Sequence, residues 1–300
     1  MNDNNFDSIA SAFDQYSQQI AVLDFKTKVI QKFITLSHKE YLEAKNNPET
    51  PPDGLWYVWR SAATVIDLFA ERPDISYLNN CSIENEQYED IIIELANDAM
   101  NMIIMWAYEK SRLFIFNLYA ELGKLDIHLW RDTDRRSISN LKETDNGPYY
   151  NIINELMKKG DIKPVLLRMH KCNECINETL SRDRYSINYY LRFLTIECMR
   201  HVITHRLGIT NKSELRETLI KRHGKNKNGK PFLDNNEEYF IDCYLVQYSN
   251  DNTQIKPVFA HLIKNETYYL IPNKTIAIIR DLATYCRTLY KCWEKHFETN

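Results

Sequence analysis

The chain has 300 residues, a formal net charge of −3, and only 7 Gly and 9 Pro. A chain of this length forms one large or two small domains, and the scarcity of Gly and Pro favours long helices with few tight turns. The net charge excludes a global attraction for nucleic acid, so any RNA binding must come from local basic patches.

The sequence carries no sign of secretion or of membrane insertion. Its first residues, Met1 to Asn5, are polar and lack the basic and apolar regions of a signal peptide. No apolar run approaches the roughly 20 residues that span a membrane. The 7 cysteines are unevenly spaced, which indicates reduced thiols and not a disulfide framework. We therefore expect a cytoplasmic protein that does not bind a membrane.

Long helices dominate the predictions for the first half of the chain. Apolar residues at helical spacing predict one helix from Phe6 to about Lys45 and a second from Trp56 to Glu71. Ser82 has the residue type of an N-cap and predicts the start of a third helix, which Gly123 is expected to end. The charged run from Arg131 to Arg136 is predicted to be a loop.

The second half is predicted to add helices and a few strands. The expected helices begin near Pro164, run from about Asn177 to Leu207, from Lys212 to His223 and from Lys274 to His296. The expected strands cover residues 239–248, 258–263 and 267–271.

These elements predict a mainly α fold, a helical bundle of long helices with a small antiparallel β insertion near the C-terminus. The sequence shows neither an internal repeat nor a clear linker. Residues 1–300 are therefore expected to form a single helical domain, in which residues 209–273 are an insertion with a short helix and a β-hairpin.

The segment from Arg200 to His205 combines one permanent cation and two imidazoles within little more than one helical turn. It ends a helix whose apolar residues recur at spacings of four, three and four, namely Ile187, Leu191, Leu194 and Cys198. Extending this stripe predicts that His201 and His205 lie on the inward face. Arg200 points about 140° away from His205 and has to reach around the helix edge to join them.

Readings without catalysis stay open for these residues. A histidine on an apolar helix face is often a core residue, and a cation near a helix C-terminus can simply complement the helix dipole. Two histidines four residues apart could bind zinc, but a catalytic zinc needs a third protein ligand. Glu197, one turn before His201, could orient its imidazole or be solvated. Thr204 could face the site or hydrogen-bond within its own helix.

Arg200, His201 and His205 match the signature of the HEPN superfamily, and the chain resembles that superfamily in its helical character. The signature is an Arg, several intervening residues and a His, often with Asn, Asp or His directly after the Arg. The resemblance implies a helical bundle that forms a homodimer, with the two motifs facing each other across a shared cleft. It also implies a metal-independent endoribonuclease of a toxin–antitoxin, abortive-infection or other antiviral system. Other members are non-catalytic modules that bind RNA, a nucleotide or a protein partner.

The residues of the motif suit RNA cleavage without a metal. In that reaction the ribose 2′-OH is the nucleophile, a neutral imidazole takes its proton, and a guanidinium holds the phosphorane oxygens. On this basis His205 is the expected acid–base residue and Arg200 the phosphate clamp, while His201 orients His205 or the substrate. The products would be a 2′,3′-cyclic phosphate and a free 5′-OH.

A basic segment follows the motif. Lys221, Arg222 and Lys225 form the best local basic patch, which could hold substrate phosphates or the acidic surface of a partner such as an antitoxin. The alternative is a solvated loop.

A cysteine-containing segment precedes the motif. His170, Cys172 and Cys175 lie within the spacing of metal ligands, but a structural zinc would need a fourth ligand, so no metal is expected. The sequence also lacks a Gly-rich phosphate loop, a nucleophile elbow and a dinucleotide fingerprint, so no cofactor is expected.

Overall fold

A computed structural model shows the arrangement of most of the chain. It describes residues 6–46, 59–67, 74–83, 85–139, 155–158, 162–181, 187–205, 210–223, 238–239, 241–242, 245–247, 254–257, 261–263, 269–271 and 273–299. Within these ranges, no helix combines the length and the apolar character that crossing a membrane requires.

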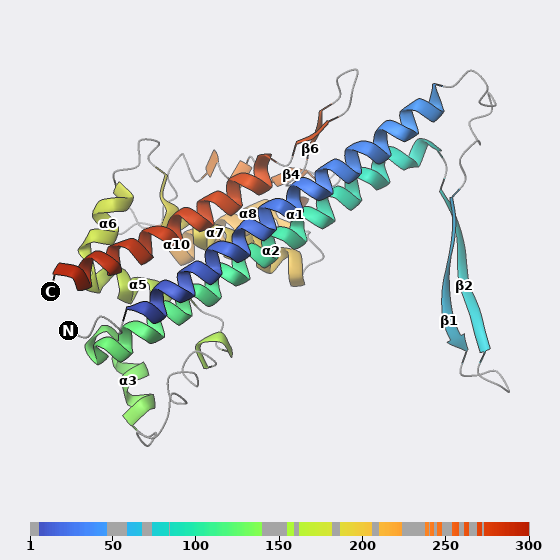
Figure 1. The fold of residues 1–300 in the computed structure, drawn as a ribbon. Coiled ribbons are helices and arrows are strands. Elements are labelled where there is room, and N and C mark those ends of the chain that lie inside the picture. The colour runs from blue at the N-terminus through green and yellow to red at the C-terminus, as the bar shows by residue number, and fades with distance from the viewer. Residues whose placement is uncertain are drawn as a thin grey trace. The chain divides into compact units, whose positions relative to one another are not determined.

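The chain divides into two compact units. The first unit consists of Met1–Thr27, Met100–Phe259 and Asn273–Asn300, and the second of Lys28–Ala99 and Ala260–Pro272. Two long helices, α1 (Asp7–Lys45) and α2 (Asn85–Leu125), contribute a part to each unit (Figure 1). The single domain with an insertion at 209–273 stays a prediction.

Helices make up most of the first unit, and the mainly α fold expected from the sequence is confirmed. After α2 follow the 3-10 helix η2 (Ile127–Leu129) and the helices α3 (Asp132–Ser139), α5 (Lys163–Cys172), α6 (Glu174–Ser181), α7 (Tyr189–His205), α8 (Lys212–His223) and α10 (Asn273–Thr299). The last helix is amphipathic. Its residues Ile278, Leu282, Leu289 and Trp293 are buried, as their periodicity predicts.

An aromatic cluster joins the first helix of the chain to α2 and to the last helix. Phe13 of α1 stacks on Tyr290 of α10 with 4.3 Å between the ring centroids, and Tyr16 stacks on Phe114 of α2 at 5.0 Å. The hydroxyl of Tyr16 also hydrogen-bonds that of Ser111 in α2, at 3.0 Å. Aromatic pairs of this kind contribute about 0.5–1.5 kcal/mol each beyond their buried area. The three helices therefore share one core.

The motif helix α7 is buried on two sides. On one side, the ring of Phe193 lies 5.3 Å from that of Tyr108 in α2 and 5.5 Å from that of Tyr285 in α10. On the other side α7 packs on α8 through a cluster that contains Leu191, Cys198, Val202, Leu215 and Leu219. A helix with core contacts on both sides has no single inward face.

Short antiparallel strands accompany the helices. In the first unit, β5 (Gln254–Pro257) pairs with β3 (Thr210–Asn211) and with β4 (Leu245–Gln247). In the second unit, β1 (Trp59–Asp67) and β2 (Asp74–Ile83) form a hairpin, and β6 (His261–Ile263) pairs with β7 (Tyr269–Ile271). The expected antiparallel strands near the C-terminus are thus confirmed, although they are shorter than predicted and residues 238–239 and 241–242 are helical.

The region before α2 differs from its prediction. Residues 59–67 form strand β1, so the helix predicted from Trp56 to Glu71 is wrong there. Ser82 lies in β2, and α2 begins at Asn85. Residues 59–67 include Thr, Val and Ile, and such short apolar runs do not distinguish a strand from a helix by periodicity alone.

Two further helices also differ from their predictions. The charged run predicted as a loop contains the start of α3. Asp132 and Asp134 lie in the first turn of this helix, where the helix dipole favours negative charge, so these residues stabilise the start of the helix. Asp134 also accepts a hydrogen bond from the Tyr119 hydroxyl at 2.8 Å and pairs with Arg131. The helix predicted from Asn177 to Leu207 is divided into α6 and α7.

Gly123 does not end α2, which continues to Leu125. Its function is steric: a Cβ atom at position 123 would lie 1.7 Å from Cε2 of Trp130. Trp130 is fully buried, and its indole N–H donates a hydrogen bond to the carbonyl of Tyr119 at 2.7 Å. Only a residue without a side chain allows the indole to lie against α2.

Candidate functional site

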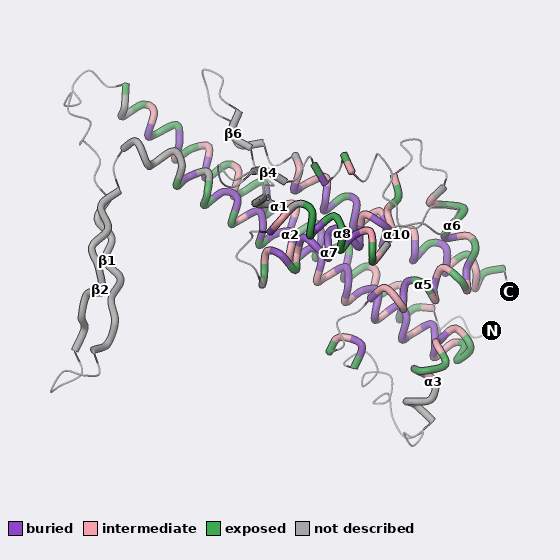
Figure 2. Tube along the Cα trace, turned by 180° about the vertical axis from the view of Figure 1, so that it is seen from behind, coloured by how far each residue is buried: buried purple, intermediate pink, exposed green. Residues whose placement is uncertain are grey.

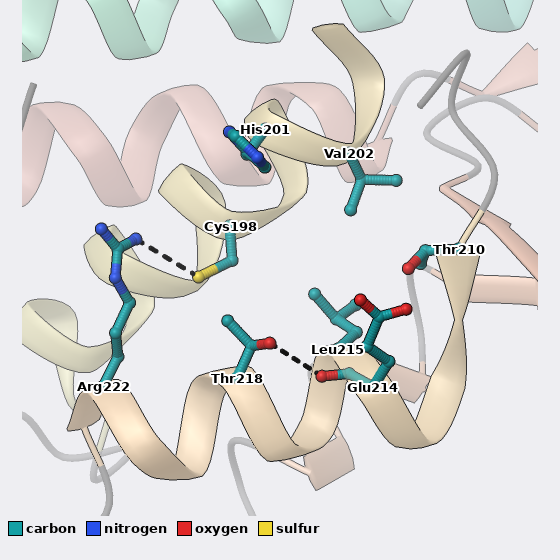
Figure 3. Close-up of a pocket in the computed structure, with 8 residues that line it drawn as sticks. All are labelled: Cys198, His201, Val202, Thr210, Glu214, Leu215, Thr218 and Arg222. Carbon is teal, nitrogen blue, oxygen red and sulfur yellow. Dashed lines mark hydrogen bonds between the residues drawn. The ribbon is translucent and has the colours of Figure 1, made fainter. Parts of the chain in front are cut away.

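The end of α7 and the facing side of α8 enclose a cavity of about 250 Å³. Its walls come from Cys198, His201 and Val202 of α7, Thr210 of β3, and Glu214, Leu215, Thr218 and Arg222 of α8 (Figure 3). The lining mixes apolar side chains with two hydroxyls, a thiol, a carboxylate, an imidazole and a guanidinium. A molecule in the cavity would therefore meet both apolar and polar groups.

Local sequence positions α8 against α7. Asn211 precedes α8, and its Oδ1 accepts a hydrogen bond from the backbone N–H of Ser213 at 2.9 Å, as an N-cap does. Leu215 and Leu219, four residues apart, then direct one face of α8 to the apolar cluster on α7. The short strand β3 fixes the start of α8 through its pairing with β5.

The structure reverses the expected directions of Arg200 and His201. Arg200 lies against α2, where its Nη2 contacts Oε1 of Glu109 at 2.7 Å and its guanidinium carbon lies 5.9 Å from the ring centre of Tyr108. His201 is exposed and lines the cavity beside α8. The expectation that His201 lies on the inward face is therefore wrong, because α7 has core contacts on two sides and its apolar stripe marks only one of them.

The remaining motif residues follow the helix. The hydroxyl of Thr204 donates to the carbonyl of Arg200 at 2.8 Å, so the expected hydrogen bond within the helix is confirmed. His205 is the last residue of α7. Its side chain lies outside the part of the chain that the structure describes.

Two buried donors without partners stand beside Glu109. Among the described residues, the Nε–H of Arg200 and the hydroxyl of Tyr108 have no hydrogen-bond partner, although both atoms are buried. Burial, followed by the charge of Glu197, raises the pKa of the Tyr108 hydroxyl well above its usual value. The hydroxyl is therefore protonated at neutral pH and available as a donor.

Arg222 faces inward. Its Nη1 donates to Oε2 of Glu197 on α7 at 3.1 Å and contacts the sulfur of Cys198 at 3.7 Å. Glu197 is buried, so the reading of this residue as a solvated one is wrong. Burial raises the pKa of the Cys198 thiol, and the nearby Arg222 opposes this shift. Cys198 is thus a buried thiol, as expected.

The basic patch predicted after the motif is only partly present. Arg222 uses its charge on Glu197, while Lys221 is exposed and pairs with Glu217 one turn earlier at 3.7 Å. Lys225 lies outside the described residues. Lys221 therefore presents its charge at the surface and Arg222 does so only in part.

His170 belongs to a hydrogen-bond network. Its Nδ1 lies 2.8 Å from Oδ1 of Asn177, and its Nε2 lies 2.8 Å from the hydroxyl of Tyr285. Cys172 and Cys175 are free thiols. In the part of the chain that the structure describes, no group of three or more His, Cys, Asp or Glu side chains is arranged to hold a metal ion.

The residues that sequence reasoning missed are Glu109 and Tyr108. They lie on α2, far from the motif in sequence, and only the packing of α7 against α2 brings them to Arg200. Helical periodicity places neither of them at a site.

No family profile, curated protein or solved structure matches this chain.

Proposed function

We propose that this chain is a metal-independent endoribonuclease of the HEPN type, which acts in the cytoplasm as a dimer with its two motifs facing each other. The observation that carries the proposal is the pair of buried donors at Arg200 and Tyr108 without a partner among the described residues. Each such donor costs about 1–3 kcal/mol while it lacks a partner. A phosphate oxygen that accepts from either donor would remove that cost.

The proposed reaction transfers the phosphorus from one ribose oxygen to another. The 2′ oxygen attacks the phosphorus, the bond from phosphorus to the 5′ oxygen breaks, and the 5′ oxygen takes up a proton. His205 accepts the proton of the 2′-OH, and Arg200 stabilises the charge on the phosphorane oxygens. His201 contacts the substrate at the mouth of the cavity. The products are a 2′,3′-cyclic phosphate and a 5′-OH.

Glu109 supports the clamp role of Arg200 by fixing the direction of its guanidinium. The carboxylate binds Arg112 as well, at 3.2 Å, so it is held from two sides. A guanidinium that is already oriented loses less side-chain entropy when it binds a phosphate. Because the cleavage of cellular RNA is toxic, an inhibitory partner protein such as an antitoxin, or a trigger from an infecting phage, fits this proposal.

The test is RNA cleavage by purified variants in the presence of EDTA. Arg200→Ala and His205→Ala should each lower cleavage at least 100-fold, and the wild type should leave cyclic phosphate ends. Arg280→Ala is the matched control, because Arg280 is an exposed arginine of α10 and should keep full activity. Wild-type cleavage by the His205→Ala protein, or loss of all activity in EDTA, would disprove the proposal.

The second candidate is a non-catalytic module that binds RNA, a nucleotide or a protein partner. The observation that favours it is the pairing of Arg200 with Glu109, since part of the guanidinium charge is already neutralised. Under this candidate the wild type binds RNA or a nucleotide without cleaving it, and Arg200→Ala lowers only the affinity. Cleavage by the wild type separates the two candidates.

A further inference from the structure

Two cysteine thiols from distant parts of the chain meet at one hydroxyl. Helix α6 packs beside the C-terminal half of α10 in the first unit, and most of its residues are exposed or partly exposed (Figure 2). At this contact the sulfurs of Cys175 on α6 and Cys292 on α10 each lie 3.6 Å from Oγ1 of Thr179. The two thiols are therefore neighbours, although more than 100 residues separate them in the sequence.

A buried asparagine holds the main chains of both cysteines. The Nδ2 of Asn173 donates to the carbonyl of Cys292 at 2.9 Å, and Oδ1 of Asn173 accepts from the backbone N–H of Cys175 at 3.1 Å. Asn173 is only 4% exposed, so water competes little for these hydrogen bonds. The position of Cys175 relative to Cys292 is thus fixed by the backbone as well as by the shared hydroxyl.

The hydrogen bonds of Thr179 connect the two sulfurs. The Cys292 thiol donates to Oγ1 of Thr179, which leaves the hydrogen of this hydroxyl for the sulfur of Cys175. The pKa of the Cys292 thiol is raised, mainly by burial and also by the Cys175 thiol at hydrogen-bond distance, while the bond to Thr179 lowers it. Each thiol is therefore within reach of the other.

The two thiols differ in their access to solvent. Cys175 is partly exposed and Cys292 is buried. A single buried thiol, such as that of Cys286, is usually an inert apolar group. In the pair at Thr179, however, a reagent from solvent reaches Cys175, and Cys292 can react with the oxidised sulfur without being exposed itself. An accessible thiol beside a second, resolving thiol is the arrangement of a redox-sensitive site.

We propose that Cys175 and Cys292 are an oxidation site at which a peroxide forms a reversible disulfide between α6 and α10. The sulfur of Cys175 attacks one peroxide oxygen, the O–O bond breaks, and hydroxide leaves with the thiol proton as water. The sulfur of Cys292 then attacks the sulfenic acid at Cys175. The S–S bond forms, the S–O bond breaks, and the departing hydroxide takes the proton of Cys292 as a second water. Both electrons that the thiols lose reduce the peroxide.

The reduced pair is the expected resting state. Disulfides in a reducing compartment are mostly transient and respond to changes in redox conditions, so a thiol reductant should reopen this bond. The bond would attach α6 to α10, the helix that also packs on the motif helix through Tyr285 and Phe193. No residue of the motif takes part, and the inference goes beyond the proposed function.

The first experiment maps the bond in the full-length chain. The reduced protein is treated with hydrogen peroxide, its remaining thiols are alkylated in urea, and the tryptic peptides are identified by mass spectrometry. Peptide 172–182 should be linked to peptide 292–295, and dithiothreitol should release both. Because the first peptide also contains Cys172, Cys172→Ser is the matched control and should form the link to the same extent.

Variants of the pair decide the assignment. Cys175→Ser and Cys292→Ala should each lower the yield of the linked peptides at least 10-fold. Cys175 is partly exposed, so its variant tests the proposal even if the change at buried Cys292 weakens the fold. A bond between Cys172 and Cys175, or a pair that stays reduced while Cys172 is oxidised, would overturn the proposal. So would a link that non-reducing electrophoresis shows only between two chains.

The second experiment measures stability by urea unfolding followed by circular dichroism. The peroxide-treated wild type should unfold at a urea concentration about 1 M higher than the reduced wild type, because the bond constrains the unfolded chain. Cys175→Ser should unfold at the same concentration with and without peroxide. A wild type that peroxide leaves unchanged or destabilises would contradict the proposal. RNA cleavage by the reduced protein reports on the proposed function independently.

Discussion

At the scale of single residues, Tyr108 makes the most direct prediction about the site. Its hydroxyl is buried without a partner among the described residues. Tyr108→Phe should therefore raise the free energy of unfolding by about 1 kcal/mol in the absence of RNA. If the hydroxyl binds a phosphate oxygen, the same change should lower cleavage by about 10-fold, as the loss of one hydrogen bond to a charged group does.

Urea unfolding and cleavage rates measure the two effects of Tyr108→Phe separately. Tyr16→Phe is the matched control, because its buried hydroxyl has a partner in Ser111 and its removal should destabilise the protein by about 1 kcal/mol. A loss of stability in Tyr108→Phe as large as in Tyr16→Phe would show that the Tyr108 hydroxyl already has a partner.

Gly123 makes a prediction in which two effects oppose each other. Alanine favours a helix over glycine by about 1 kcal/mol in a helix interior and by less in the last turn, where position 123 of α2 lies. Its Cβ, however, would lie 1.7 Å from the ring of the fully buried Trp130, which would have to move and lose its hydrogen bond to Tyr119. The clash should win, so Gly123→Ala should lower the free energy of unfolding by about 2 kcal/mol. Urea unfolding followed by tryptophan fluorescence would show this, with Lys124→Ala close to wild type.

His170 makes a prediction about pH. Burial lowers the pKa of His170 below its usual value of about 6.5, and the hydrogen bond to Asn177 opposes this shift. The unfolded chain then binds a proton at this residue at a higher pH than the folded chain does. The contribution of His170 to stability is therefore fully present above about pH 6.5 and declines as the pH falls toward the folded pKa.

Replacing His170 tests this linkage. Between pH 7.5 and pH 5, the free energy of unfolding should fall less in His170→Gln than in the wild type, because the variant lacks the titrating imidazole. Urea unfolding of both proteins at several pH values measures it. The linkage would be wrong if the wild type and the variant lost the same stability over this range.

At the scale of elements, the contact between α7 and α8 depends on the ion pair of Glu197 and Arg222. Glu197 is buried and Arg222 is 36% exposed. Arg222→Ala would leave the buried carboxylate of Glu197 without this partner and should lower the free energy of unfolding by about 2 kcal/mol. This loss is smaller than for a fully buried ion pair because solvent screens the charge of Arg222. Thermal or urea unfolding measures the loss. Arg216→Ala on the exposed side of α8 should change stability by less than about 0.5 kcal/mol, and an equal loss in both variants would contradict the role of the pair.

The elements also show how far the sequence predicts this fold. The helices α1, α8 and α10 were predicted within a few residues from apolar residues at helical spacing, and of these three α10 has the clearest division into one apolar and one polar face. The prediction was wrong for β1 and for α3, where a short apolar run and a charged run are each compatible with more than one structure. Local pattern alone cannot decide such segments, because their partners lie elsewhere in the chain.

The candidate site shows the same limit. The position of the motif at the end of a helix was predictable from periodicity, and so was the hydrogen bond of Thr204 within that helix. The direction of Arg200 was not, because α7 contacts α2 and α10 on one side and α8 on the other. An apolar stripe identifies an inward face only in a helix that is buried on one side.

At the scale of the whole molecule, charge limits how RNA can bind. The net charge is −3, and several arginines of the described part pair with carboxylates, as in Arg192 with Asp281 and Arg222 with Glu197. Long-range attraction for RNA is therefore weak, and binding depends on the few cations that reach phosphates.

The dependence of RNA affinity on salt tests this limit. Each phosphate of a single strand that a cation neutralises adds about 0.7 to the slope of log Kd against log salt concentration. If Arg200 of each of two facing chains binds one phosphate, the slope should be about 1.4, and Arg200→Ala should reduce it toward zero. Fluorescence anisotropy with a labelled RNA between low and physiological salt measures this slope. A slope above about 3 that is unchanged in Arg200→Ala would contradict this assignment. RNA binding would then belong to the basic segment that contains Lys221 and Lys225, and replacing those two lysines should lower the slope.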